Sequence, residues 1–178
     1  MKESHNVFKV LLLGDAGVGK RALITRSLSG FPVEDLKQTI GVDFYTKNRE
    51  VNGQNFTLKI WIIARYERFR FILSRYCKGS NGAFILYDIT NPSTLEFIPE
   101  WTQILRKEVE NIPILLVGTK LDLEKSRSVS REDALELVKS EGINEYIECS
   151  MITGENIETA FDILIKLMSQ QSYTINYS

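Results

Sequence analysis

The chain has 178 residues, of which 43% are hydrophobic and 25% are charged. This length and composition are typical of one folded domain and exclude a chain that is mainly disordered. The net charge of −1 provides no basic excess for binding nucleic acid, so no nucleic-acid partner is expected.

The first predicted strand, Val7–Leu13, leads directly into a glycine-rich segment at 14–20. That segment reads G-x-x-x-x-G-K and precedes a helical stretch. In this strand–loop–helix context, backbone N–H groups surround phosphate oxygens and the lysine reaches the β- and γ-phosphates. A chance glycine-rich turn is the alternative, and the context argues against it. The expected phosphate-binding residues here are Asp15, Ala16, Gly17, Val18, Gly19, Lys20, Arg21 and Ala22.

Arg21 stands where Ser or Thr normally follows the lysine and ligates Mg²⁺. Arginine has no acceptor atom and stays protonated in proteins, so it cannot ligate a cation. Two interpretations follow. The guanidinium replaces part of the metal's charge beside the phosphates, or it points into solvent.

A β-hairpin is predicted next, because Asn52-Gly53 joins the strand-like runs Val42–Val51 and Phe56–Ile63. Further apolar runs predict buried parallel strands at Gly82–Tyr87, Ile112–Val117 and Tyr146–Cys149. Amphipathic helices are expected at 95–105, after Ser130 with Asp133 in a capping box, and at 157–167. This alternation predicts a three-layer α/β fold whose mostly parallel sheet has one antiparallel edge. Ligands bind such sheets at the carboxyl ends of the strands.

Several spaced motifs together resemble the small GTPases of the Ras superfamily, most closely the Rab branch. Besides the phosphate loop, they are Thr39–Phe44, Lys59–Trp61, Glu67–Arg70, Tyr87–Thr90, Gly118–Asp122 and Glu148–Ser150. The resemblance implies a P-loop GTPase (G domain) fold with a six-stranded, mostly parallel sheet and one antiparallel edge strand. It implies one domain over residues 1–178, with a core at about 7–170 and short flexible termini.

The resemblance also implies that the protein binds GDP or GTP. Asp122 matches the acid that accepts hydrogen bonds from the guanine N1 and N2 groups, and the stem of Lys120 would lie under the base. An ordinary loop acid is the alternative for Asp122. The full guanine-binding set implied is Thr119, Lys120, Asp122, Ser150, Met151, Ile152 and Phe31.

The family pattern breaks down after Trp61. Ile62 replaces the Asp that supports Mg²⁺, Arg65 replaces the switch II Gly, and Tyr66 replaces the catalytic Gln that orients water. Because hydrolysis needs the metal, the water and charge stabilisation together, we predict weak or absent hydrolysis and assign no catalytic residue. The resemblance also implies that Thr39 binds the phosphates. Mg²⁺ is expected to bind weakly or not at all, with Thr39 as a ligand if it is retained.

The leading interpretation is therefore a guanine-nucleotide-binding regulatory protein with a degenerate active site. A slow GTPase completed by a partner and a nucleotide-independent scaffold are the alternatives. Protein partners are expected to bind switch I, about residues 31–44, and switch II, about residues 62–78. Positive charge around switch II fits either a solvated helix face or an acidic partner.

The remaining features concern cellular location. The two cysteines, Cys77 and Cys149, have no disulfide or metal-site spacing and suit a reducing cytosol. Residues 1–6 contain no apolar signal, and no apolar run approaches the ~20 residues that span a bilayer. No prenylatable cysteine lies in residues 175–178. We therefore expect a cytoplasmic protein without a direct lipid anchor.

Overall fold

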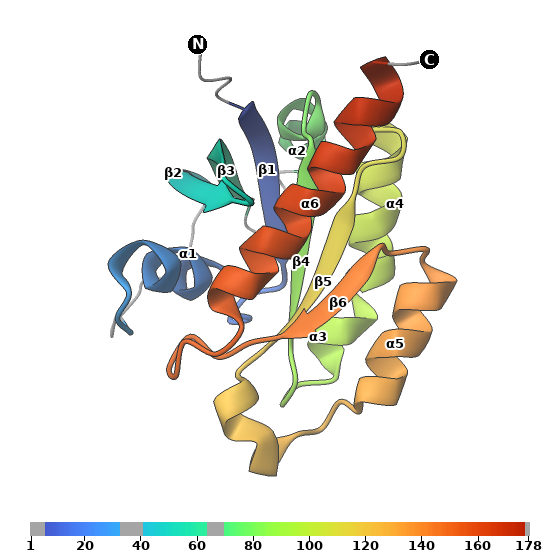
Figure 1. The fold of residues 1–178 in the computed structure, drawn as a ribbon. Helices are drawn as coiled ribbons and strands as arrows, with labels where there is room; N and C mark the ends of the chain where they lie inside the picture. Colours follow the sequence, from blue (N-terminus) through green and yellow to red (C-terminus); the bar gives the residue numbers. More distant parts are fainter. Residues whose placement is uncertain (1–5, 33–40, 64–69, 177–178) are drawn as a thin grey trace.

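A six-stranded sheet lies between two layers of helices in the computed structural model, which describes residues 6–32, 41–63 and 70–176 (Figure 1). The strands are β1 (Asn6–Gly14), β2 (Val42–Val51), β3 (Gln54–Ile63), β4 (Gly82–Asp88), β5 (Ile114–Thr119) and β6 (Glu145–Glu148). Their order is β2-β3-β1-β4-β5-β6. Only the β2–β3 pair is antiparallel among these strands, so the predicted α/β fold class and its antiparallel edge are confirmed.

The helices cover both faces of the sheet. They are α1 (Lys20–Ser29), α2 (Arg70–Cys77), α3 (Ser93–Glu96), α4 (Ile98–Glu108), the 3₁₀ helix η2 (Leu121–Ser126), α5 (Arg131–Ser140) and α6 (Ile157–Asn176). Helices α1 and α6 pack on one face, whereas α2, α4 and α5 pack on the other. None of the helices in the described residues is long and apolar enough to cross a membrane.

The hairpin prediction is confirmed. Strand β2 covers Val42–Val51, and the chain turns into β3 at Asn52 and Gly53, whose φ angles are 52° and 74°. The apolar side chains at alternate positions along β3 are all buried: Phe56, Leu58, Ile60 and Ile62. Strands β1, β4 and β5 are covered on both faces, which explains their continuous apolar runs. Strand β5 begins two residues later than expected, directly after Pro113, which has no N–H to donate.

The helix expected at 95–105 is instead two helices, α3 and α4, separated at Phe97. Pro99 explains the break, because proline inside a continuous helix removes a hydrogen bond and clashes with the carbonyl four residues earlier. In the first turn of α4 it is tolerated. The N-cap at Ser130 is confirmed by the Asp133 N–H, which donates to the Ser130 hydroxyl at 3.0 Å.

Candidate functional site

The carboxyl ends of β1, β4, β5 and β6 meet at one edge of the sheet, the lower edge in Figure 1. The loop between β1 and α1 begins this site. Gly17 and Gly19 adopt φ of 77° and 94°, in the left-handed region that favours glycine. A Cβ on Gly19 would also lie 3.0 Å from the Met151 Cε atom. The loop therefore needs its glycines for conformation and, at Gly19, for space.

Lys20 begins α1 with its ammonium turned back into this loop. Its Nζ donates to the carbonyl oxygens of Gly14 and Asp15, each at 2.8 Å, and the residue is 8% exposed. Burial lowers the pKa of Lys20 to about 8, although the Asp15 carboxylate acts in the opposite direction. The loop thus surrounds a partly desolvated cation whose charge a phosphate group would stabilise.

Arg21, on the first turn of α1, forms an ion pair with Asp43 on β2. Its side chain is 24% exposed. The hydrogen bond to Asp43 raises the pKa of the guanidinium further, so Arg21 stays charged. The interpretation in which Arg21 points into solvent is therefore wrong. Its guanidinium links α1 to β2, whose first residues belong to switch I.

Two side chains at the phosphate end, Arg21 and Ile62, lack the oxygen atoms that a magnesium site needs. Mg²⁺ takes oxygen ligands in near-octahedral geometry. Arg21 offers only N–H groups and is already held by a carboxylate. Ile62, at the position of the supporting Asp, is fully buried and apolar. The two side chains that would hold or steady a metal here therefore do not fit one.

The opposite end of the site is built by Asp122 and Ser150. The Ser150 hydroxyl donates to Asp122 Oδ1 at 2.6 Å and accepts from the Thr153 N–H at 3.0 Å. Ser150 is fully buried, whereas Asp122 is exposed. One carboxylate oxygen is thus held by the protein, and the exposed carboxylate can accept further hydrogen bonds from a ligand.

Thr119 joins the two ends of the site. It is fully buried, and its hydroxyl lies 2.8 Å from the Val18 carbonyl of the phosphate loop and 3.0 Å from the Tyr87 carbonyl. Met151 is 8% exposed and packs in the core beneath the loop. Both side chains are therefore turned away from the surface where a base would lie.

Lys120 follows Thr119 in a left-handed conformation, with φ of 65°. Its Nζ lies 2.5 Å from Asp88 Oδ2 at the end of β4. Burial opposes ionisation of Asp88, but hydrogen bonds from Lys120 and Thr90 outweigh it and lower the pKa of the carboxyl. The sequence placed Asp88 at a strand end but gave no sign of this pairing. Its position at the carboxyl end of a buried strand was the only available signal.

The expected apolar contacts to the base are available at the surface. Phe31 is 73% exposed and Ile152 is 62% exposed. Three other predicted residues, Thr39, Arg65 and Tyr66, lie outside the described residues. Their roles stay predictions.

An aromatic cluster lies between the two expected partner segments. Phe44 on β2 is 48% exposed and meets Trp61 on β3 edge-on, with ring centroids 4.9 Å apart. Trp61 in turn contacts Tyr76 on α2 at 5.2 Å. An exposed aromatic group supported by two others is typical of a protein-binding surface.

Comparison with known proteins gives consistent matches over most of the chain. The Ras family model matches residues 9–170. Ras-related protein RABA2a of Arabidopsis thaliana is 39% identical over 165 residues, which cover 92% of this chain and 76% of that protein. Ras-related protein RABA4b of the same plant is 40% identical over 171 residues, covering 96% and 75%. Ras-related protein Rab-1 of Theileria parva is 38% identical over 173 residues, covering 96% and 78%.

Proposed function

The chain belongs to the Ras family, within which it is Rab-like, and from this premise we propose that it is a regulatory protein that binds GDP or GTP at the carboxyl edge of its sheet. The observation that carries the proposal is the hydrogen bond from Ser150 to Asp122. It holds an exposed carboxylate ready to accept two donors, and the N1 and N2 groups of guanine are such a pair.

The phosphates would lie at the other end of the site. Backbone N–H groups of the loop and the N-terminus of α1 favour an anion there. Lys20 would exchange its two loop carbonyls for phosphate oxygens and gain charge compensation that the buried ammonium now lacks. The Thr119 contact with Val18 keeps the phosphate loop and the base-binding residues at a fixed separation.

Selectivity for guanine over adenine would come from Asp122. Adenine carries no N–H at N1 and no amino group at C2, so the carboxylate would be left without its donors. A site built to hydrogen-bond a substrate rejects an analogue that lacks the groups, because buried partners stay unpaired. Lys120 would lie along the base while Asp88 holds its ammonium, and Phe31 and Ile152 would supply apolar contact.

Mg²⁺, when bound in this family, supplies positive charge to the phosphates. We propose that this chain holds it weakly or not at all, and that Arg21 supplies part of the charge instead. The support is the donor set, in which Arg21 and Ile62 replace oxygen-bearing side chains. Because Asp43 already holds the guanidinium, Arg21 would act on the phosphates through its positive charge.

We further propose that intrinsic hydrolysis is weak or absent. Ile62, Arg65 and Tyr66 together remove the groups on which the family's chemistry depends. A partner that supplies catalytic groups would make the protein a slow GTPase. A permanently filled or unused pocket would make it a scaffold, and the Phe44–Trp61–Tyr76 cluster offers a surface for either role.

Equilibrium titration tests the proposal. Nucleotide-stripped protein is titrated with fluorescent GDP and, separately, with fluorescent ADP. We expect GDP to bind at least 100-fold more tightly than ADP, in line with ~10²–10⁵-fold discrimination by hydrogen-bonding sites. Equal affinity for the two nucleotides would contradict guanine recognition by Asp122, and absence of binding by both would favour the scaffold.

A further inference from the structure

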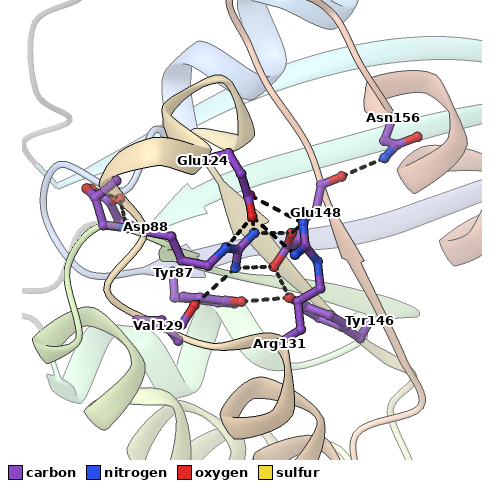
Figure 2. Close-up of polar contacts among 10 residues, drawn as sticks. Tyr87, Asp88, Glu124, Val129, Arg131, Tyr146, Glu148 and Asn156 are labelled. Atoms are coloured by element: carbon purple, nitrogen blue, oxygen red, sulfur yellow. Dashed lines mark hydrogen bonds and ion pairs between the residues drawn. The ribbon is translucent and has the colours of Figure 1, made fainter.

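A cluster of charged side chains gathers where η2, α5 and β6 meet (Figure 2). Glu124 comes from η2, Glu148 from β6 and Arg131 from α5, and their polar ends converge on one point. Arg127, immediately after η2, lies at the centre of this cluster. Its side chain is 13% exposed and that of Glu148 is 6% exposed, so these two charges are largely removed from water.

Arg127 donates hydrogen bonds from all three nitrogen atoms of its guanidinium. Toward Glu124, Nε donates at 3.0 Å and Nη2 at 2.6 Å. Toward Glu148, Nη1 donates at 2.8 Å and Nη2 at 2.6 Å, and Nη1 also donates to the Val129 carbonyl at 3.0 Å. A guanidinium has five N–H donors in a planar fork, and these contacts account for all five. Two carboxylates are therefore held side by side by one rigid group.

The two carboxylates occupy matched places relative to the base-binding residues. Glu124 lies two residues after Asp122, and Glu148 lies two residues before Ser150. The backbones of the two segments also meet, through the Leu121 N–H and the Cys149 carbonyl at 3.1 Å. Arg127 thus joins the two chain segments whose side chains form the Asp122–Ser150 hydrogen bond.

Glu148 is itself anchored from its other side. The Tyr146 hydroxyl donates to its carboxylate, and the hydroxyls of Tyr87 and Tyr146 lie 2.8 Å apart (Figure 2). Asn156 Nδ2 donates to the Glu148 carbonyl at 2.8 Å. Hydrogen bonds from Arg127 lower the pKa of Glu124 to about 2, so this carboxylate stays ionised at neutral pH.

Arg131 provides a natural contrast. It contacts the same two carboxylates, Glu124 at 3.2 Å and Glu148 at 3.0 Å, but its side chain is 50% exposed. Exposed ion pairs contribute little, whereas bidentate pairs out of water fix geometry. The cluster therefore contains one partly buried arginine that sets the geometry and one exposed arginine that adds charge.

We infer that Arg127 is a positioning residue for guanine recognition: by clamping Glu124 to Glu148 it holds the Asp122 carboxylate where both base donors reach it. The inference rests on the proposed nucleotide binding. It concerns how accurately the Asp122 carboxylate is placed. The affinity of an analogue that lacks one of the two donors reports on this placement. Inosine diphosphate keeps the N1 donor and lacks the 2-amino group.

The experiment compares the affinities of GDP and inosine diphosphate for the whole chain and three variants. In Arg127→Lys the charge stays, but an ammonium cannot bind two carboxylates in bidentate fashion. We expect the wild type to prefer GDP about tenfold, in line with one lost hydrogen bond to a charged group, and Arg127→Lys to prefer it threefold or less. Arg131→Ala is the matched control and should keep the wild-type ratio within twofold.

The ratio separates positioning from stability, because a smaller folded fraction lowers both apparent affinities equally. If thermal unfolding shows that Arg127→Lys does not fold, Glu124→Ala decides, since that side chain is 48% exposed, and its ratio should fall in the same direction. A folded variant with the wild-type ratio overturns the inference, as does a wild type that binds the two nucleotides equally. A wild type that binds neither nucleotide contradicts the proposed function itself.

Discussion

Arg21 and Asp43 form an ion pair between the first turn of α1 and the beginning of β2. In relatives of this family, the position of Arg21 carries a hydroxyl that helps to hold Mg²⁺. Here the cationic side chain of Arg21 is held by Asp43, at the point where switch I passes into β2. The ion pair therefore connects α1 directly to β2.

The first prediction concerns the metal. GDP dissociation from the wild type should change less than threefold when EDTA removes Mg²⁺, because Arg21 and Ile62 leave two oxygen supports absent. The rates are measured by displacement of fluorescent GDP. Arg21→Ser should restore part of the dependence, limited by Ile62. A roughly hundredfold acceleration by EDTA in the wild type would mean that the cation is still bound tightly.

The second prediction concerns Asp122. Replacing it with Ala should weaken GDP binding by at least ~1.4 kcal/mol, about tenfold, because both base donors lose their acceptor. Isothermal titration of the wild type and the variant measures this difference. The exposed Asp133 on α5 is a suitable control, and Asp133→Ala should leave the affinity for GDP unchanged. Unchanged binding by Asp122→Ala would make Asp122 an ordinary loop acid.

The third prediction is a pH dependence that arises from Lys20. Burial lowers its pKa to about 8 in the free protein, whereas phosphates favour the protonated form, so binding above pH 8 must take up a proton. GDP affinity should therefore fall roughly tenfold between pH 7 and pH 9. Lys20→Met should bind more weakly and lack this component. If the affinities of the two proteins for GDP change with pH in parallel, Lys20 does not titrate between pH 7 and pH 9.

The lowered pKa of Lys20 also predicts how the free energy of unfolding depends on pH. The unfolded chain keeps its Lys20 proton up to about 10.5, the ordinary value. Between pH 8 and 10.5 the unfolded state therefore binds more protons than the folded state, and the contribution of Lys20 to stability rises with pH. Chemical denaturation gives the free energies of unfolding of nucleotide-free wild type and Lys20→Met. The difference between the two proteins is the contribution of Lys20 at each pH. A difference that falls with pH in this range would contradict the assignment.

The fifth prediction concerns hydrolysis. Intrinsic turnover of GTP should be at or below about 10⁻⁴ s⁻¹, the order of magnitude of unassisted Ras, because the segment after Trp61 lacks the family's catalytic groups. A single-turnover assay with excess protein gives the rate. Turnover near one per second without a partner would contradict the prediction of a degenerate active site.

Local patterns predicted the fold well. The alternation of β3 and the Asn52-Gly53 turn fix the hairpin within a few residues, and the phosphate loop is encoded in one short segment. Residue Pro99 was a local signal for the break between α3 and α4, but the amphipathic period across 95–105 obscured it. Such features depend on residues that are close together in the sequence, so the sequence alone is enough to predict them.

The contacts that define this particular site depend on residues far apart in the sequence. Arg21 meets Asp43 across 22 residues, and Arg127 meets Glu148 across 21. Nothing in the local pattern distinguishes partly buried Arg127 from exposed Arg131, because both follow η2 in a charged stretch. Which arginine is desolvated is decided by where β6 lies beside β5, and only the structure provides this.

The central claim is that the protein binds a guanine nucleotide, and the nucleotide content of freshly purified protein tests it most directly. The protein is purified without nucleotide and denatured, and the released nucleotides are separated and quantified by chromatography. We expect close to one guanine nucleotide per chain in the wild type and much less in Asp122→Ala purified in parallel. Adenine nucleotide at the same occupancy, or nucleotide-free wild type that also fails to bind added GDP, would contradict the claim.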